Sequence, residues 1–144
     1  MTSLQDAIER SRATGDFTPL NQAVPYARFL NLTANLVEDE LVFRMGYRPE
    51  HIGNPVLRAL HGGIIGSLLE TAALSHVTWE MSQVRVPKTI TITIDYLRSG
   101  RAVDTYATSR ITKMGRRVVN VHTTAWQEDR ARPIASAIAH FLID

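Results

Sequence analysis

The chain has 144 residues, of which 44% are hydrophobic and 21% are charged, and its formal net charge is +2. This length suits one domain over residues 1–144, and the small, dispersed positive charge argues against nucleic acid as a partner. The sequence contains no cysteine, which excludes disulfide bonds and a thiolate nucleophile. The N-terminal residues lack the apolar core of a secretory signal, and no run of 18 apolar residues occurs, so we expect a cytoplasmic protein with no membrane span.

Four segments precede the most apolar part of the chain. Residues 3–14 read SLQDAIERSRAT and predict a short helix, because their Leu, Ala and Ile share one helical face. A loop is expected next, and residues 31–37 and 41–47 then predict the two strands of a hairpin, separated by acidic residues. Residues 48–60 contain two prolines and a glycine, which predicts a second loop.

The stretch HGGIIGSLLETAALSHVTW, residues 61–79, has helical length and good helix formers. We therefore predict a central helix over about 62–81. A single carboxylate, Glu70, lies in the middle of this otherwise apolar segment. An unpaired carboxylate is costly to bury, so its presence indicates either a partner for the charge or a use for it.

After this helix the spacing of hydrophobic residues changes from about 3.6 residues, as in a helix, to two residues, as in a strand. In KTITITIDYLRSG, apolar residues alternate with Thr and Asp from Ile90 to Tyr96, which predicts a strand with one apolar face. A turn with Gly115 at positive φ is expected between the next two strands. These further strands are predicted at 103–111, 117–126 and 134–143. An antiparallel sheet against a helix that is apolar almost all round predicts an α+β fold in which the sheet wraps the helix.

The string IGNPVLRALHGGIIGSLLETAALS resembles the signature of hotdog-fold acyl-CoA thioesterases of the phenylacetate-pathway (PaaI) type. In that family an Asn, a His-Gly-Gly and an Asp or Glu on the central helix recur in this order, and here they are Asn54, His61 with the two glycines after it, and Glu70. The segments TITIDYLRSG and KMGRR are similar to the same family, so the resemblance covers nearly the full length. It implies a hotdog fold, an acyl-CoA substrate, no cofactor beyond the coenzyme A of that substrate, and a dimer, commonly paired into tetramers, with sites at the interface.

Hydrolysis of a thioester needs a group that binds the developing oxyanion and a group that activates water or attacks the carbonyl. Gly62 and Gly63 begin the predicted helix, where backbone N–H groups are unpaired, the macrodipole is positive and no side chain blocks a carbonyl oxygen. We expect the Gly62 amide to be the main donor, with Gly63 beside the substrate. Glu70 is then the general base, or the nucleophile that forms an anhydride.

Two roles stay open for each of the other signature residues. Asn54 orients the attacking water or the thioester, or it shapes the loop before the helix. His61 is a third catalytic group, or it fixes the loop by hydrogen bonding at the helix start. No metal is expected, because metal-ligand spacing is absent among the remaining histidines, His51, His76, His122 and His140.

The spacing of the two main catalytic candidates bears on the oligomeric state. Gly62 and Glu70 are eight residues apart, which corresponds to roughly 12 Å along one helix at 1.5 Å per residue. This is too far for both groups to touch one thioester carbon. Two such helices running antiparallel across a two-fold axis would bring Gly62 of one chain near Glu70 of the other. The spacing therefore predicts a homodimer with two equivalent sites.

Basic residues at strand ends and in a turn are candidates for binding the phosphates of coenzyme A, since Arg binds phosphate oxygens bidentately. They are Arg98, Arg101, Arg116 and Arg117.

Two alternatives to a thioesterase remain. A dehydratase or hydratase on the same fold is disfavoured, because a His before Pro-Gly and a His-Asp pair are both missing. A non-catalytic acyl-CoA binding module would keep the pocket without turnover. A sensor of that class normally carries an appended DNA-binding or partner domain, and only the short N-terminal helix is expected here.

Overall fold

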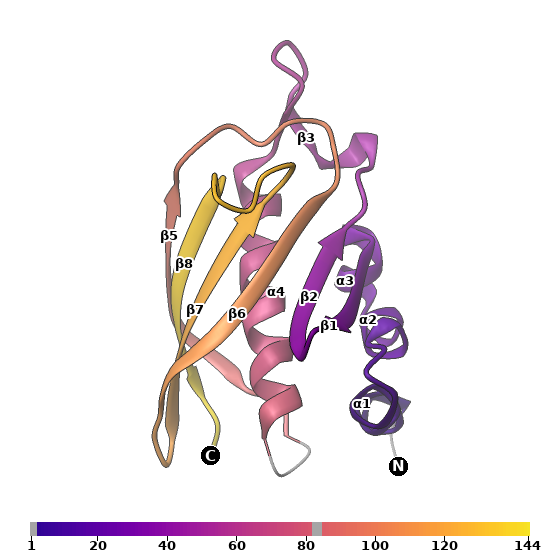
Figure 1. Cartoon of the computed structure of the whole chain (residues 1–144), viewed down its shortest axis with the longest axis vertical. Helices are drawn as coiled ribbons and strands as arrows, with labels where there is room; N and C mark the ends of the chain where they lie inside the picture. The colour runs from indigo at the N-terminus through magenta and orange to yellow at the C-terminus, as the bar shows by residue number, and fades with distance from the viewer. Residues whose placement is uncertain (1–2, 82–84) are drawn as a thin grey trace.

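The computed structural model describes residues 3–81 and 85–144 and contains a six-stranded antiparallel sheet that curves around one long helix, α4 (Gly62–Glu80) (Figure 1). The other helices are α1 (Ser3–Thr14), α2 (Thr18–Ala23) and α3 (Pro25–Leu30), with a 3-10 turn η1 (Pro49–His51). The strands are β1 (Leu32–Val37), β2 (Glu40–Met45), β3 (Ile52–Asn54), β4 (Ala59–Leu60), β5 (Lys88–Tyr96), β6 (Thr105–Met114), β7 (Val118–Trp126) and β8 (Ala135–Leu142). The main sheet has the order β1-β2-β6-β7-β8-β5, and β3 and β4 form a separate hairpin. The predicted α+β hotdog arrangement is therefore confirmed.

The segment between α1 and β1 was expected to be a loop, and this expectation is wrong. It contains α2 and α3, each with a proline in its first turn. Proline is well tolerated there, because its missing N–H would have no partner in a helix anyway. Asn31 ends α3 in the left-handed conformation, with φ of 57°. Two helices of six residues are too short to leave a readable hydrophobic period in the sequence.

The two predicted hairpin turns have different backbone requirements. Glu38 and Asp39 connect β1 to β2 with φ of 51° and 65°, as the twist of a two-residue hairpin turn demands. The turn between β6 and β7 contains Gly115, as predicted, but its φ is not positive, so that part of the prediction is wrong. Glycine is needed there for space, since a Cβ would lie 2.8 Å from the carbonyl oxygen of Val118.

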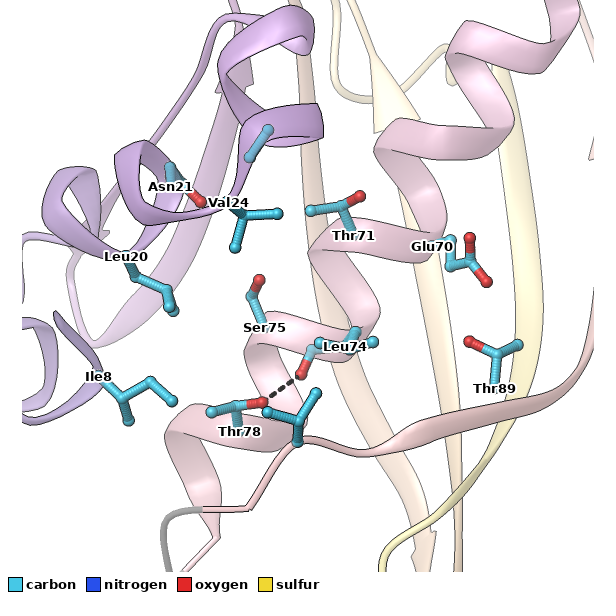
Figure 2. Close-up of a pocket in the computed structure, with 12 residues that line it drawn as sticks. Ile8, Leu20, Asn21, Val24, Glu70, Thr71, Leu74, Ser75, Thr78 and Thr89 are labelled. Carbon is cyan, nitrogen blue, oxygen red and sulfur yellow. Dashed lines mark hydrogen bonds between the residues drawn. The ribbon is translucent and has the colours of Figure 1, made fainter. Parts of the chain in front are cut away.

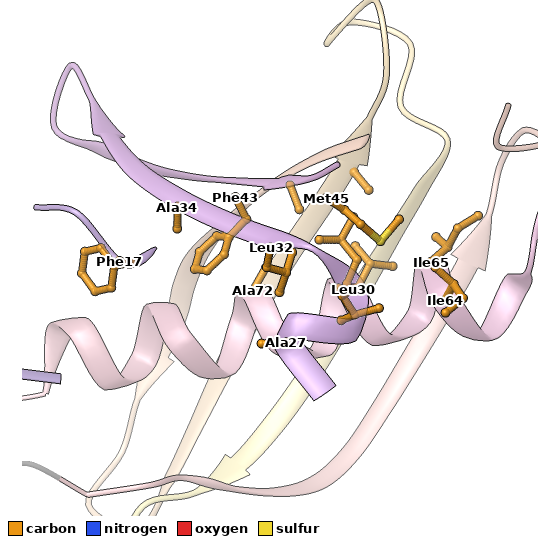
Figure 3. Packing of buried hydrophobic residues seen from close by; sticks show 14 of the residues in the cluster. Phe17, Ala27, Leu30, Leu32, Ala34, Phe43, Met45, Ile64, Ile65 and Ala72 are labelled. Atoms are coloured by element: carbon orange, nitrogen blue, oxygen red, sulfur yellow. The ribbon is translucent and has the colours of Figure 1, made fainter. Parts of the chain in front are cut away.

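One side of α4 is fully packed against the sheet and is called here the packed face. It consists of Leu68, Leu69, Ala72, Ala73 and Val77, all 0% exposed. Figure 3 shows part of the cluster around this helix, in which large side chains from β1, β2 and the N-terminal segment lie over α4. None of the helices in residues 3–81 and 85–144 is both long and apolar enough to span a membrane.

The other side of α4 is called here the open face. It consists of Gly63, Ser67, Glu70, Thr71 and Leu74, which are exposed or half-buried. Positions three or four residues apart share one side of a helix, so these residues form a continuous stripe. The helices α1, α2 and α3 cover this stripe only in part (Figure 1). The open face is therefore the side of the central helix that is available for a ligand or a second chain.

Strand β5 lies at the end of the sheet order and pairs with β8 along one edge. The predicted apolar face is only half packed, because Ile92 and Ile94 contact the core while Ile90 and Tyr96 are 51% and 53% exposed. The register with β8 shifts between Thr89 and Thr91. Within the described residues, the second edge of β5 has no strand beside it.

Candidate active site

The first turn of α4 is capped by the histidine that precedes it. His61 has extended backbone angles, with φ of −62° and ψ of 132°, and its Nδ1 accepts the N–H of Gly63 at 2.9 Å. Its carbonyl oxygen accepts the N–H groups of Ile64 and Ile65. Among the described residues the Gly62 N–H has no acceptor, and Gly62 is exposed. Of the two glycine amides considered from the sequence, only that of Gly62 remains able to bind an oxyanion.

Tyr96 fixes the peptide group between Gly62 and Gly63, which follows the free Gly62 N–H. Its hydroxyl donates to the carbonyl oxygen of Gly62 at 2.8 Å. The ring lies beside the glycine, since a Cβ at position 62 would be 3.7 Å from three Tyr96 ring and hydroxyl atoms. Sequence reasoning assigned Tyr96 to the apolar face of a strand and missed this contact. One feature of the sequence could have indicated it: Tyr96 carries a hydroxyl at the end of an alternation whose other apolar residues are isoleucines.

A second histidine fixes the loop that leads into α4. His51 is 0% exposed, and its Nε2–H donates to the carbonyl oxygen of Phe29 at 3.0 Å while Nδ1 accepts the N–H of Arg48 at 3.3 Å. The His51 carbonyl oxygen in turn accepts the N–H of His61 at 2.8 Å. These bonds connect α3 to the start of α4. His51 is thus a positioning residue that the sequence did not single out.

Asn54 makes a local turn in the structure. Its Oδ1 accepts the backbone N–H groups of Val56 and Leu57 at 3.1 and 3.0 Å, which is an Asx-type turn. The turn lies between β3 and β4, at the tip that extends beyond the sheet in Figure 1, and its apolar side chains are 89% and 73% exposed. Of the two roles considered for Asn54, these contacts favour shaping the loop.

The Glu70 carboxylate lies beside an apolar cavity of about 280 Å³ (Figure 2). The cavity is bordered by α4, by α1, α2 and α3, and by the segment that enters β5, and it is partly open to solvent. Its lining consists of Ile8, Leu20, Asn21, Val24, Ala27, Glu70, Thr71, Leu74, Ser75, Thr78, Val86 and Thr89. In the part of the chain that the structure describes, no hydrogen bond or ion pair reaches Glu70. The other carboxylate of α4, Glu80, is 3.2 Å from Nε2 of His76.

The sequence raised the question of whether a cation of the same chain pairs with Glu70, and none of the described residues does so. Glu70 is half-buried and free to act on a ligand. Within residues 3–81 and 85–144 no group of three or more His, Asp or Glu side chains is arranged to hold a metal ion.

The arginine candidates separate into two groups. Arg98 lies in a shallow depression that also contains Gly62 and Tyr96, so it is near the free amide. Arg116 and Arg117 lie in the turn between β6 and β7, at the opposite end of the molecule from the start of α4 (Figure 1). Arg117 approaches Asp144 there, with 3.6 Å between Nε and Oδ2. Arg101 pairs with Glu128 at 2.5 Å. One chain therefore does not bring these arginines to a single phosphate site.

Known proteins resemble this chain in sequence and in fold. Residues 53–142 match the family model of the acyl-CoA thioesterase N-terminal domain. The medium/long-chain acyl-CoA thioesterase YigI of Escherichia coli is 30% identical over 136 residues, which cover 83% of this chain and 86% of that protein. A crystal structure from Chromobacterium violaceum is 34% identical, with a TM-score of 0.79 over 100% of this chain and 98% of that chain. A Bacillus halodurans protein solved with CoA is 20% identical and has the same fold, with a TM-score of 0.74 over 100% and 96% of the two chains.

The matched residues contain most of the features described above. They run from the loop before α4, through the free amide and Glu70, to the last strand of the sheet. The helices α1, α2 and α3, which border the cavity, lie outside the matched residues. On the family match and the identity with YigI, the chain belongs to the acyl-CoA thioesterase family, whose members are hydrolases acting on thioester bonds.

Proposed function

We propose that the chain hydrolyses acyl-CoA thioesters at two equivalent sites of a homodimer, each formed by the start of α4 in one protomer and by Glu70 of the partner subunit. The observation that carries this proposal is the spacing of two unsatisfied groups on one continuous helix. The Gly62 N–H and the Glu70 carboxylate are eight residues apart, about 12 Å along the axis of α4. One thioester cannot contact both groups of the same chain, so each group needs a complement from a second chain.

In the proposed reaction the thioester carbonyl oxygen accepts a hydrogen bond from the Gly62 N–H. The positive end of α4 stabilises the negative charge that develops on this oxygen. Glu70 of the partner subunit removes a proton from the attacking water, or attacks the carbonyl carbon to form an anhydride that water then hydrolyses. Both routes release the free acid and the thiol of coenzyme A. His61 has no chemical step in this scheme, because its Nδ1 already accepts the Gly63 N–H.

The free edge of β5 supports the dimer. An unpaired strand with exposed apolar side chains is a template for pairing with another strand, and β5 exposes Ile90 and Tyr96. Two β5 edges paired antiparallel across a two-fold axis would join the sheets and bring the two α4 helices together in opposite directions. The exposed Val56 and Leu57 offer a further apolar surface on which dimers could pair into a tetramer.

The arginines fit coenzyme A in the same arrangement. Arg98 lies beside the Gly62 amide and is placed to meet a phosphate that enters with the thioester. Arg116 and Arg117 lie at the other end of the chain, and an antiparallel dimer brings that end toward the partner's site. The proposal therefore assigns Arg98 to the site of its own chain and the other two to the site across the interface.

The experiment that tests the catalytic assignment is release of free thiol from a panel of acyl-CoAs. Glu70→Gln keeps the shape of the side chain and removes the base, so we expect kcat to fall by a factor of about 10² to 10⁴. The thermal unfolding of the variant should match that of the unmodified protein, because none of the residues that the structure describes is paired with Glu70. The chain has no cysteine and gives no background with a thiol reagent. Acyl-CoA binding without turnover in the unmodified protein would instead indicate a binding module.

Mixed dimers test whether each site uses two chains. Gly62→Pro removes the amide donor at a first helical position, where proline is tolerated, and His61 already has the extended conformation that precedes proline. A dimer of one Gly62→Pro chain and one Glu70→Gln chain contains one intact site if the sites are shared. Random reassortment of the two inactive proteins should then restore about one quarter of the unmodified activity. A site formed within one chain would give no restoration.

A further inference from the structure

The apolar cavity beside Glu70 contains a buried amide with an unpaired donor. Asn21 is 3% exposed, lines the cavity from α2, and its Nδ2 has no hydrogen-bond partner. Figure 2 shows the side chain on the wall opposite α4, with its oxygen turned toward Val24. A buried polar group without a partner is costly in a folded protein, and such groups are rare. Because Nδ2 itself is fully buried, the amide must rotate toward the cavity before a ligand or water there can pair with it.

A second polar side chain faces the same space from α4. Ser75 is 5% exposed, lines the cavity, and its hydroxyl has no partner among the described residues. In Figure 2 the Ser75 oxygen points into the region between α4 and α2. The walls around these two groups are otherwise mostly aliphatic, with Ile8, Leu20 and Leu74 among them. A cavity of this kind accepts an apolar group and fixes it through a few convergent polar contacts.

We propose that this cavity holds the distal part of the acyl group, and that Asn21 and Ser75 select acyl groups carrying a hydroxyl. A hydroxyl both donates and accepts, so it can pair with either end of the Asn21 amide and with the Ser75 hydroxyl at once. A plain hydrocarbon chain in the same space leaves both side chains unpaired. This inference rests on the proposed function, because it takes the cavity beside Glu70 as the acyl site.

The dimensions of the cavity limit the acyl group. A volume of about 280 Å³ corresponds to about nine groups the size of a water molecule, at roughly 30 Å³ each. The lining residues of α4 run from Glu70 to Thr78, which is about 12 Å of helix axis. An acyl group of medium length therefore fills the cavity, with its hydroxyl several carbons away from the thioester. Thr71 and Ser75 lie between the two ends of this path.

The test compares matched substrates. Octanoyl-CoA is compared with octanoyl-CoAs that carry one hydroxyl, placed in turn on each carbon from the fifth to the eighth. We expect one position to raise kcat/KM by about tenfold to a hundredfold over the plain chain, because a site built around a hydrogen bond rejects the analogue that lacks it. Equal kcat/KM across the series would overturn the proposal, since water would then satisfy Asn21 as well as the substrate does.

Two variants assign the preference to the amide. Asn21→Leu keeps the branched shape of the side chain and removes its polar atoms, so the ratio of hydroxylated to plain kcat/KM should fall to near one. Ser11→Ala is the matched control, because Ser11 is also buried with an unpaired oxygen but does not line the cavity. It should leave the ratio unchanged. A ratio that persists in Asn21→Leu would overturn the assignment. Thermal unfolding checks that both variants fold, and Asn21→Leu should be at least as stable as the unmodified protein.

A separate measurement distinguishes this proposal from the hydrolysis it rests on. Calorimetry with octanoic acid and the hydroxylated octanoic acids reports binding in the cavity without any turnover. Preference for one hydroxylated acid that is lost in Asn21→Leu would support the cavity assignment even if no acyl-CoA is hydrolysed. Equal binding of the plain and hydroxylated acids, in a protein that does hydrolyse acyl-CoAs, would overturn the selectivity and leave the thioesterase function intact.

Discussion

The two faces of α4 come from the same short stretch of sequence but differ in burial. The packed face, from Leu68 to Val77, has no exposed surface and is covered by the sheet of its own chain. The open face borders a cavity and carries Glu70, with which no residue in the described part of the chain is paired. Packing explains every residue on the first face. On the second face, packing does not explain the carboxylate of Glu70, and the proposed function gives it a use through a ligand and a second chain.

A pair of leucines tests this difference in stability. Leu68 on the packed face is 0% exposed, and truncation to Ala should lower the free energy of unfolding by about 2–5 kcal/mol, because it leaves a cavity in the core. Leu74 on the open face is half-buried and already borders a cavity, so its truncation should cost less than half as much. Urea denaturation of both variants measures the two values. Equal losses would contradict the division and indicate that the open face is as tightly packed as the other.

A pair of glycines tests the same contrast at the start of the helix. A Cβ on Gly53 would lie 2.6 Å from the Cα of His61, so Gly53→Ala must displace the cap of α4 and should cost about 1–3 kcal/mol. A Cβ on Gly62 would meet Tyr96 at an ordinary 3.7 Å, and Gly62→Ala should change stability by less than about 0.5 kcal/mol. Thermal unfolding gives both numbers. A large loss in Gly62→Ala would mean that packing, and not the free amide, requires glycine at position 62.

The sequence predicted the packed parts of the molecule well, because their signals are local and repeated. The period of the central helix and the alternation after it are sufficient to predict α4 and the strands that follow it along the chain. The pairing of β5 with β8 at the edge of the sheet was not predicted. The sequence singled out Gly62 and Glu70 as catalytic candidates because each is exceptional within a regular pattern. Gly62 lacks a side chain at a helix start, and Glu70 is a charge in an apolar run. Asn54 and His61 were found by the same signature, and their contacts favour structural roles for both.

The remaining features depend on contacts between distant segments. Asn21 faces the cavity because α2 folds back over α4, and nothing near it in the sequence predicts that short helix. Tyr96 reaches the Gly62 carbonyl across a gap of 34 residues. In the proposed dimer, the position of Arg116 relative to a substrate depends on the partner chain. Local patterns therefore predict the scaffold and the candidate reactive groups, whereas the shape of the cavity beside Glu70 depends on tertiary packing.

The smallest expected effect comes from His76, a buried histidine one helical turn after Ala72 and therefore on the same side of α4 as the packed face. His76 is 6% exposed, and burial lowers its pKa below the usual 6.5, although the neighbouring Glu80 and the more distant Glu40 act in the opposite direction. The unfolded chain then binds more protons than the folded one between the lowered pKa and 6.5. The stability that a neutral His76 contributes is therefore present above pH 6.5 and is lost as the pH falls toward the lowered value.

We expect the urea midpoint of the unmodified protein to fall between pH 8 and pH 5.5, and the midpoint of His76→Gln to fall less. The pKa of His122 is also lowered by burial, but that residue is present in both proteins and cancels in the difference. Glu80→Gln should steepen the dependence, because it removes the charge that supports protonated His76. Identical pH profiles for the unmodified protein and His76→Gln would mean that water reaches this histidine, and that the side of α4 assigned to packing is itself partly open.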